Sequence, residues 1–331
     1  MRLLRNVLLT LLLGGLAAGA LAWWWLQRPL PLAAATVELA IEPGTSPRAV
    51  AEQWAAAGVQ VDPTLLWLWF RASGRAHQMR AGTYAIEQGT TPRQLLDRML
   101  RGEQQMEAVR IIEGWTFAQM REALARAPAL KPTTQGKTDA EVMALLGRPG
   151  VPAEGRFFPD TYHYSKGASD FIVLRTAMRT MQSRLEAAWA ERAPDLPLAT
   201  MEQALILASI VEKETGIEAD RTKVAGVFTN RLRIGMPLQT DPTVIYGLGT
   251  AFDGNLRKRD LLADTPFNTY TRKGLPPTPI ALPGAASLKA AVQPARGKAL
   301  YFVARGDGSS VFSDNLADHN RAVNQYQRGG Q

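Results

Sequence analysis

The sequence predicts an α+β protein in three parts: a single N-terminal transmembrane helix, a small strand/helix module and a larger mixed domain built around a buried helix. Three observations predict this arrangement. Residues 7–26 are uncharged and almost wholly apolar, the next segment repeats a strand–turn–helix pattern, and an apolar helix at 200–215 stands among polar loops. With 331 residues, the chain is long enough for two domains with buried cores.

The apolar run has the length of a membrane-spanning helix. Twenty residues rising about 1.5 Å each cover a hydrocarbon core of about 30 Å, and three tryptophans mark the far end, where indole rings favour the interface. Arg2 and Arg5 predict that the tip, residues 1–6, stays in the cytoplasm. The rest would then lie on the periplasmic side of the inner membrane. A signal peptide cleaved after Ala-Leu-Ala at 20–22 is the alternative.

A tether and a repeated unit follow the apolar run. Residues 27–36 contain two prolines, which resist helix formation and favour an extended tether. The pattern I-E-x-G-T-[ST]-P-R then occurs at Ile41 and again at Ile86. In each copy a strand-like segment leads to a glycine turn, and Ser46 or Thr91 caps a helix that begins with proline.

These copies predict a module over residues 37–105. A helix over 63–74 lies between the copies, and a looser third copy at 111–124, beyond the module, has Thr116 as its N-cap. The repeat has two interpretations: a strand–turn–helix unit reused only for folding, or a glycan-binding module of the LysM type. Both need the same caps and apolar faces. The pattern therefore leaves both interpretations open.

The larger domain, residues 106–331, mixes helices with irregular polar segments. The region 236–298 is rich in Pro, Gly, Thr and Asn, and the chain ends in a strand, a Gly-Asp-Gly turn, a second strand and a helix. The helices expected before the loop-rich region cover residues 169–192, 200–215 and 219–234.

The helix at 200–215 ends in an unusual charged cluster. Thr200 and Gln203 are placed as a capping box, and Gly216 is placed to stop the helix. Glu214 then falls in the last turn, above apolar residues and at the negative end of the helix dipole. Both effects raise the pKa of a carboxyl group, as a general acid near neutral pH requires.

The neighbouring carboxylate, Glu212, points about 160° away around the helix. We expect it to pair with a base such as Arg231 on the next helix. An ordinary exposed helix end would carry the same Glu-Lys-Glu sequence, so spacing alone does not establish catalysis.

Polar and aromatic side chains in the surrounding loops suit a carbohydrate ligand. Amides, hydroxyls and carboxylates hydrogen-bond sugar hydroxyls, and aromatic rings stack on pyranose faces. Pro-rich turns with Asx caps would look similar. The candidate ligand-binding residues are Gln239, Thr240, Asp241, Tyr246, Asn268, Tyr270 and Asp160.

Composition and the histidines restrict the chemistry further. The absence of Cys excludes disulfides, thiolate nucleophiles and Cys-ligated metals, and His77, His163 and His319 lack the paired spacing of a zinc motif. We expect no cofactor and no metal. The net charge of +8 is spread along the chain, which favours an acidic polymer or an anionic membrane over nucleic acid. A merely basic soluble protein would have the same charge.

Four segments resemble the motif blocks of the YceG-like (MltG) endolytic murein transglycosylases. They are "ILASIVEKETG", "VAGVFTNRLRIGMPLQTDPTVIYG", "FNTYTRKGLPPTPIALPGAASLKAAVQPA" and "LYFVARGDGSSVFSDNLADHNRAV". The resemblance covers nearly the whole chain and implies a membrane anchor, a LysM-like module and a catalytic domain over 106–331. It also implies peptidoglycan glycan strands as substrate and cell-wall synthases, the penicillin-binding proteins, as partners.

In that family the Glu before Thr in the Glu-Lys-Glu-Thr segment is the catalytic acid/base, which is Glu214 here. The resemblance implies that Glu214 protonates the bond between N-acetylmuramic acid and N-acetylglucosamine and then helps to close a 1,6-anhydro ring. Asp241 and Asp160 are the candidate second carboxylates if the enzyme is instead a muramidase that uses water. A catalytically silent peptidoglycan-binding scaffold is the remaining alternative.

Overall fold

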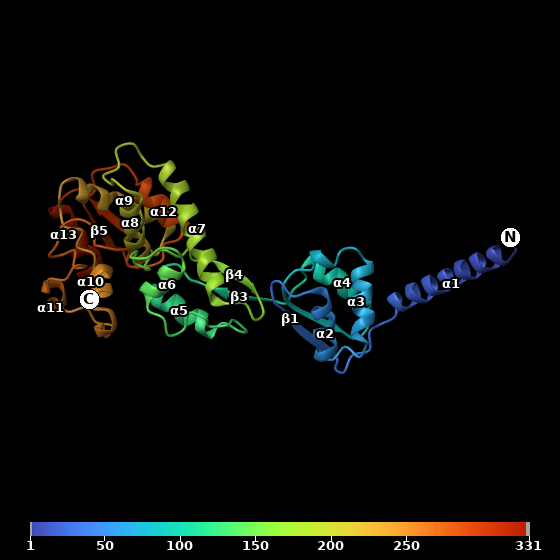
Figure 1. The fold of residues 1–331 in the computed structure, drawn as a ribbon. Coiled ribbons are helices and arrows are strands. Elements are labelled where there is room, and N and C mark those ends of the chain that lie inside the picture. The colour runs from blue at the N-terminus through green and yellow to red at the C-terminus, as the bar shows by residue number, and fades with distance from the viewer. Residues whose placement is uncertain (1, 329–331) are drawn as a thin grey trace. The chain divides into compact units, whose positions relative to one another are not determined.

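The computed structural model describes residues 2–328 and shows a mixed chain of helices and short strand pairs with one N-terminal apolar helix (Figure 1). Residues 1 and 329–331, the outermost parts of the expected tip and of the expected domain 106–331, lie outside the described residues. The chain divides into two compact units. Unit 1 runs up to Ala108 and also takes 128–131 and 163–168, while unit 2 takes 109–127, 132–162 and the chain from Ser169.

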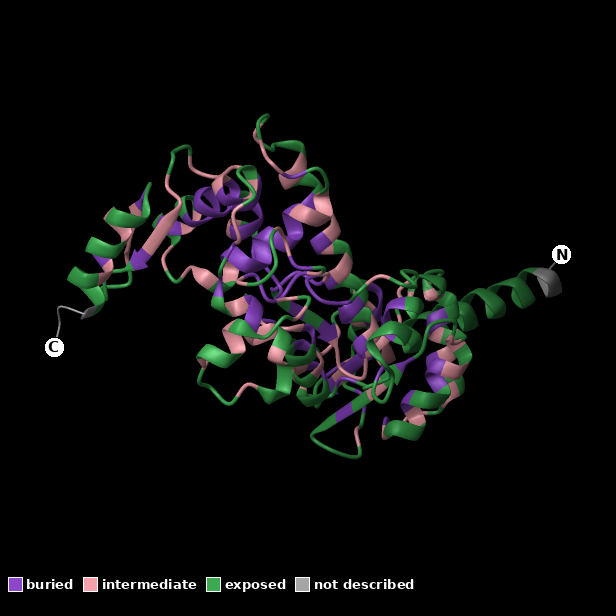
Figure 2. Ribbon diagram, turned by 90° about the vertical axis from the view of Figure 1, so that its left-hand side faces the viewer, coloured by how far each residue is buried: buried purple, intermediate pink, exposed green. Residues whose placement is uncertain are grey.

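α1 (Arg2–Gln27) is a helix of 26 residues whose apolar side chains from Val7 to Trp24 are exposed, as the N-terminal helix in Figure 2 shows. Its length and composition suit a membrane span, although a signal sequence would pass the same test. Residues 30–33, part of the expected tether, are bonded to later segments of unit 1. Leu30 is buried, and its backbone N–H donates to the carbonyl of Thr90 at 2.8 Å.

The first two sequence repeats form the strands and helices that the sequence predicts. β1 and β2 pair antiparallel, with Val37 opposite Ile86. The hydroxyl of Ser46 accepts from the N–H of Ala49 at 3.2 Å, and Thr91 forms a capping box. The remaining elements of unit 1 pack around Trp54 and other fully buried side chains. The elements are β1 (Thr36–Ile41), α2 (Pro47–Ala57), α3 (Pro63–Ala72), η1 (Ala76–Gln78), β2 (Gly82–Glu87) and α4 (Pro92–Arg101).

A second strand pair joins β3 (Met106–Arg110) to β4 (Thr161–Ser165). Unit 2 consists mainly of helices and ordered loops, with β5 and β6 as an antiparallel hairpin. Its elements are α5 (Phe117–Arg126), α6 (Asp139–Leu145), α7 (Asp170–Ala190), α8 (Met201–Glu214), α9 (Glu218–Arg233), α10 (Asp241–Leu248), η2 (Gly249–Ala251), α11 (Lys258–Leu262), α12 (Ala285–Val292), β5 (Tyr301–Ala304), β6 (Ser310–Ser313), α13 (Leu316–Val323) and η3 (Asn324–Arg328).

α8 is the buried helix that the apolar run predicts. Every residue from Ala204 to Val211 is buried, and the hydroxyl of Thr200 caps the first turn by accepting from the N–H of Gln203 at 3.2 Å. The side chain of Gln203 returns to the N–H of Ala199 rather than to that of Thr200, so the capping box is only half formed. The core of unit 2 therefore fixes α8 along its length.

The end of α8 differs from the expectation in one respect. Gly216 does not adopt the left-handed conformation that would stop a helix. The helix ends instead because Thr215 is extended, with φ −113° and ψ 113°, while its N–H still donates to the carbonyl of Val211 at 3.1 Å. Glu214 is thus the last helical residue.

Candidate active site

Glu214 combines partial burial with a fixed hydrogen-bond donor. Leu207, Ile210 and Val211 behind it are fully buried, and the hydroxyl of Thr240 donates to its Oε1 atom. Burial raises the pKa of Glu214 above its ordinary value, and the charge of Asp241 acts in the same direction, against the Thr240 hydrogen bond and the charge of Arg231. The net direction is upward, as the position at the helix end predicts.

The donor to Glu214 is held by a cluster of buried threonines. The N–H of Thr240 donates to the hydroxyl of Thr269 at 3.1 Å, and the hydroxyl of Thr243 donates to the carbonyl of Thr240 at 2.7 Å. Thr243 and Thr269 also share a hydrogen bond of 2.9 Å between their hydroxyls. All three residues are buried, so the hydroxyl that faces Glu214 has little freedom to move.

Arg231 also acts on Glu214, a role that the sequence does not predict. Its buried guanidinium donates to the carbonyls of Leu300 and Leu238, both at 2.7 Å. Its positive charge lowers the pKa of Glu214, although burial outweighs this effect. The predicted pairing of Arg231 with Glu212 is therefore wrong.

Glu212 has a different partner and a structural position. It pairs with Arg221 at 3.4 Å, and its side chain is only 7% exposed. Its Oε2 atom accepts from the N–H of Gly284 at 2.9 Å, and Arg221 also donates to the hydroxyl of Ser287 at 2.6 Å. Glu212 thus ties α8 to α9 and to the start of α12. Glu212 and Glu214 therefore have different surroundings, although they lie in one helical turn: Glu212 is ion-paired with Arg221, whereas Glu214 accepts from the hydroxyl of Thr240.

Four of the predicted ligand-binding residues belong to the surroundings of Glu214. Thr240 contacts it directly, and Asp241 acts on its pKa. The hydroxyl of Tyr270 donates to Asp241 at 2.5 Å. Gln239 is exposed and has φ +48°, a strained value for a residue other than glycine. Such strain is often found at functional sites.

The structure places the other three predicted residues differently. Asn268 is fully buried, and its amide donates to the carbonyls of Ala263 and Leu261 while its oxygen accepts from the N–H of Tyr270. Asp160 is exposed and accepts from the N–H of Thr161, at the start of β4. Tyr246 is directed to a second acidic residue rather than to Glu214.

That acidic residue, Glu154, was not predicted. It is buried, accepts from the N–H of Phe117 at 3.0 Å and from the hydroxyl of Tyr246 at 3.2 Å. Burial raises the pKa of Glu154 to about 7, although both hydrogen bonds act to lower it. The ring of Tyr246 packs edge-on against Phe267, with centroids 4.9 Å apart. Glu154 therefore holds α10, the helix that begins beside Glu214.

His319 stacks on the ring of Tyr301, with centroids 5.1 Å apart, and burial lowers its pKa. Its Nδ1 atom is buried without a hydrogen-bond partner in the structure. Over residues 2–328, the structure contains no group of three or more His, Asp or Glu residues that could hold a metal ion.

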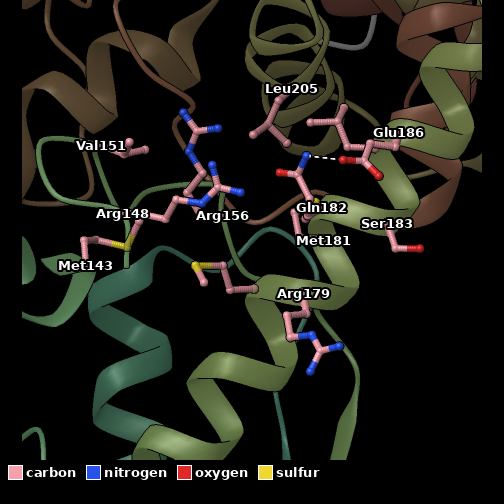
Figure 3. A pocket seen from close by; sticks show the side chains of 12 residues that line it. Met143, Arg148, Val151, Arg156, Arg179, Met181, Gln182, Ser183, Glu186 and Leu205 are labelled. Atoms are coloured by element: carbon pink, nitrogen blue, oxygen red, sulfur yellow. Dashed lines mark hydrogen bonds between the residues drawn. The ribbon is translucent and has the colours of Figure 1, made fainter. Parts of the chain in front are cut away.

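A separate cavity of about 240 Å³ lies where α7 meets the segment after α6 (Figure 3). Arg148 and Arg156 extend into it beside the sulfur atoms of methionines. Leu205 of α8 also lines it, and this residue lies about 14 Å along the helix axis from Glu214. The cavity is thus distinct from the cluster around Glu214.

Comparison with known proteins identifies relatives of the chain. The family model described as the YceG-like family matches residues 39–325. An endolytic murein transglycosylase of Bacillus subtilis is 39% identical over 176 residues, which are 53% of this chain and 48% of that protein. One of Streptococcus pneumoniae is 30% identical over 179 residues, 52% of this chain and 32% of that protein. The chain thus matches about half or less of these relatives' length.

A solved structure extends the similarity to nearly the whole chain. The crystal structure of a YceG-like protein of Listeria monocytogenes aligns with a TM-score of 0.54 and 25% sequence identity. The alignment covers 87% of this chain and 98% of the other.

Proposed function

We propose that this chain, which belongs to the YceG-like family, is an endolytic murein transglycosylase that cleaves the β-1,4 bond between N-acetylmuramic acid and N-acetylglucosamine. Relatives that match about half of its sequence carry that name. The observation that carries the proposal is the carboxyl group of Glu214, which burial keeps protonatable and which a fixed Thr240 hydroxyl orients.

The first step uses Glu214 as an acid. Because the hydroxyl of Thr240 donates to Oε1, the proton of the neutral carboxyl group resides on Oε2 and is available to the substrate. Glu214 delivers it to the glycosidic oxygen as the bond to C1 of the muramic acid breaks. The leaving N-acetylglucosamine thereby regains a hydroxyl group.

The second step uses the same residue as a base. The Glu214 carboxylate takes the proton from the C6 hydroxyl of the muramic acid, and that oxygen closes onto C1 as a 1,6-anhydro ring. Glu214 ends protonated, no water is consumed, and no second carboxylate is required. Gln239, Asp241 and Tyr270 would bind the glycan beside the reacting bond. Asn268 and Tyr246 would instead hold the loop and α10 that carry them.

Analysis of the reaction products tests this assignment. Purified glycan strands treated with the protein should yield 1,6-anhydromuramic ends, lighter than reducing ends by one water, as mass spectrometry would show. Reducing ends would make the enzyme a muramidase, with Asp241 as the candidate second carboxylate because it already acts on Glu214. No cleavage with retained glycan binding would favour the scaffold alternative.

We further propose that α1 anchors the protein in the inner membrane as a single span with a cytoplasmic N-terminus, and that a LysM-like unit 1 binds glycan. The long apolar helix and the two leading arginines support the anchor. N-terminal sequencing of the protein from the membrane fraction should find the intact N-terminus. A chain that starts near Trp23 would show that α1 is a cleaved signal peptide.

A further inference from the structure

The outer side of α3 is apolar although it faces solvent. Leu66 and Phe70 point into unit 1 and are fully buried, whereas Leu65 and Leu68 are each 48% exposed. At 100° per residue, the exposed side chains form one arc centred on Leu68. We call Leu65, Leu68 and Ala72, with the half-buried Trp67 and Trp69 at the two edges, the α3 outer face.

Neighbouring helices of unit 1 lack such a face. The exposed side of α2 carries Arg48, Glu52 and Gln53, and that of α4 begins with Arg93 and Gln94. Both helices therefore show the polar outer side expected of a soluble domain. The exposed leucines of α3 need a different explanation, since apolar surface in water is unfavourable.

Arginines border the α3 outer face. The guanidinium carbons of Arg71 and Arg48 lie 5.7 and 5.8 Å from the centre of the Trp67 ring. Within residues 2–328, Arg71 has no carboxylate partner. A face with leucines at its centre and tryptophan and arginine at its border is typical of a helix lying in the headgroup region of an anionic membrane.

Three hydrogen bonds hold α3 close to the end of α1. Leu30, three residues after α1, donates its N–H to Thr90, and the N–H of Gln60 donates to the carbonyl of Pro31, both at 2.8 Å. The indole of Trp69 donates to the carbonyl of Pro92 at 3.1 Å. If α1 crosses a membrane, α3 cannot lie far from the surface of that membrane.

We propose that the α3 outer face inserts into the headgroup region of the membrane that α1 crosses and so holds unit 1 against the lipid surface. The inference rests on the anchor part of the proposed function and is independent of the reaction at Glu214. A glycan is a poorer match, because the leucines at the centre of this face offer no hydrogen-bonding groups to sugar hydroxyls. The contact would set the height of unit 1 above the bilayer.

The chain lacks cysteine, so single cysteines can be labelled cleanly. Leu68→Cys in the full chain would carry an environment-sensitive fluorophore in vesicles of phosphatidylglycerol and phosphatidylcholine. Spin labels on the lipid chains near the headgroup should quench most of its fluorescence. Gln53→Cys, on the polar side of α2, is the matched control and should stay largely unquenched.

Leu16→Cys separates the two ways in which the inference could fail. Because Leu16 lies at the middle of the apolar run 7–26, it is measured with spin labels near the ends of the lipid chains. Quenching at Leu16 without quenching at Leu68 beyond that at Gln53 would leave the anchor intact and overturn the surface contact. Absence of quenching at Leu16 would overturn the anchor and, with it, the contact. Because Leu68 is exposed, its replacement should not prevent folding, which circular dichroism would check.

Discussion

Replacing Glu214 with glutamine is expected to lower the rate of glycan cleavage by about 10²–10⁴-fold, because general acid–base catalysis contributes that much and one group would serve both proton transfers here. Glutamine keeps the shape of the side chain, and its oxygen can still accept from Thr240. The buried residues behind it are unchanged. The variant should therefore fold and bind glycan with near-normal affinity, measured by co-sedimentation with intact glycan.

The pH dependence of the wild-type rate provides a second measurement. Because burial raises the pKa of Glu214, the acid form should persist above the range of an ordinary carboxyl group. The rate should then fall as pH rises through that raised pKa, and this limb of the profile should disappear from any residual activity of Glu214→Gln.

Glu212→Gln is the matched control from the same helical turn. It should change the rate far less, because Glu212 is occupied by Arg221 and the N–H of Gly284. Loss of the negative charge of Glu212 should instead lower the free energy of unfolding by about 1–3 kcal/mol, since Arg221 would remain with a weakened partner. Near-wild-type turnover by Glu214→Gln would refute the mechanism, whereas equal losses in both variants would point to a structural role for Glu214.

Local patterns account for the part of the site that the sequence predicts. The apolar run of α8 and the cap at Thr200 fix where the helix begins and which of its residues are buried, so the place of Glu214 beyond a buried run follows from nearby residues. The strand–turn–helix repeats of unit 1 are likewise local, because Ser46 and Thr91 cap helices a few residues away. The pairing of β1 with β2 and the contact of Thr240 with Glu214, by contrast, join residues that are far apart in sequence.

Local patterns do not predict which arginine is the partner of Glu212. Arg221 and Arg231 both belong to α9, and they lie ten residues apart, which is about 80° around the helix but about 15 Å along it. Periodicity places both on similar sides. Only the packing of α9 against α8 decides which arginine meets Glu212, and this packing is not visible in a sequence.

Polar loop residues present a similar difficulty. Asn268 and Gln239 are both amides in polar loops, yet the first is buried and bonded to backbone carbonyls while the second is exposed. A side chain that can bind a sugar hydroxyl can equally bind a carbonyl. The role of Glu154 is not visible in the sequence either, because its buried position depends on Phe117 and Tyr246, which are far from it in sequence.

Replacing Glu154 with glutamine is expected to remove a pH-dependent cost of folding. Its pKa is about 7 in the folded protein against 4.5 otherwise, so the folded state binds more protons between these values. The contribution of Glu154 to the free energy of unfolding is fully present below pH 4.5 and falls as pH rises toward 7. Above that pH the contribution is constant and about 3 kcal/mol smaller. Glutamine stays neutral and can still accept from the N–H of Phe117.

The free energy of unfolding, measured for both proteins at pH 4.5 and pH 8, tests this expectation. The variant should match the wild type at pH 4.5 and exceed it by up to about 3 kcal/mol at pH 8, while other titrating groups cancel in the comparison. Glu191→Gln, at an exposed carboxyl, should stay within about 0.5 kcal/mol at both values. A difference between Glu154→Gln and wild type that does not change with pH would contradict the raised pKa. It would mean that the hydrogen bonds of Glu154 to Phe117 and Tyr246 outweigh its burial, and that Glu154 holds α10 as a carboxylate.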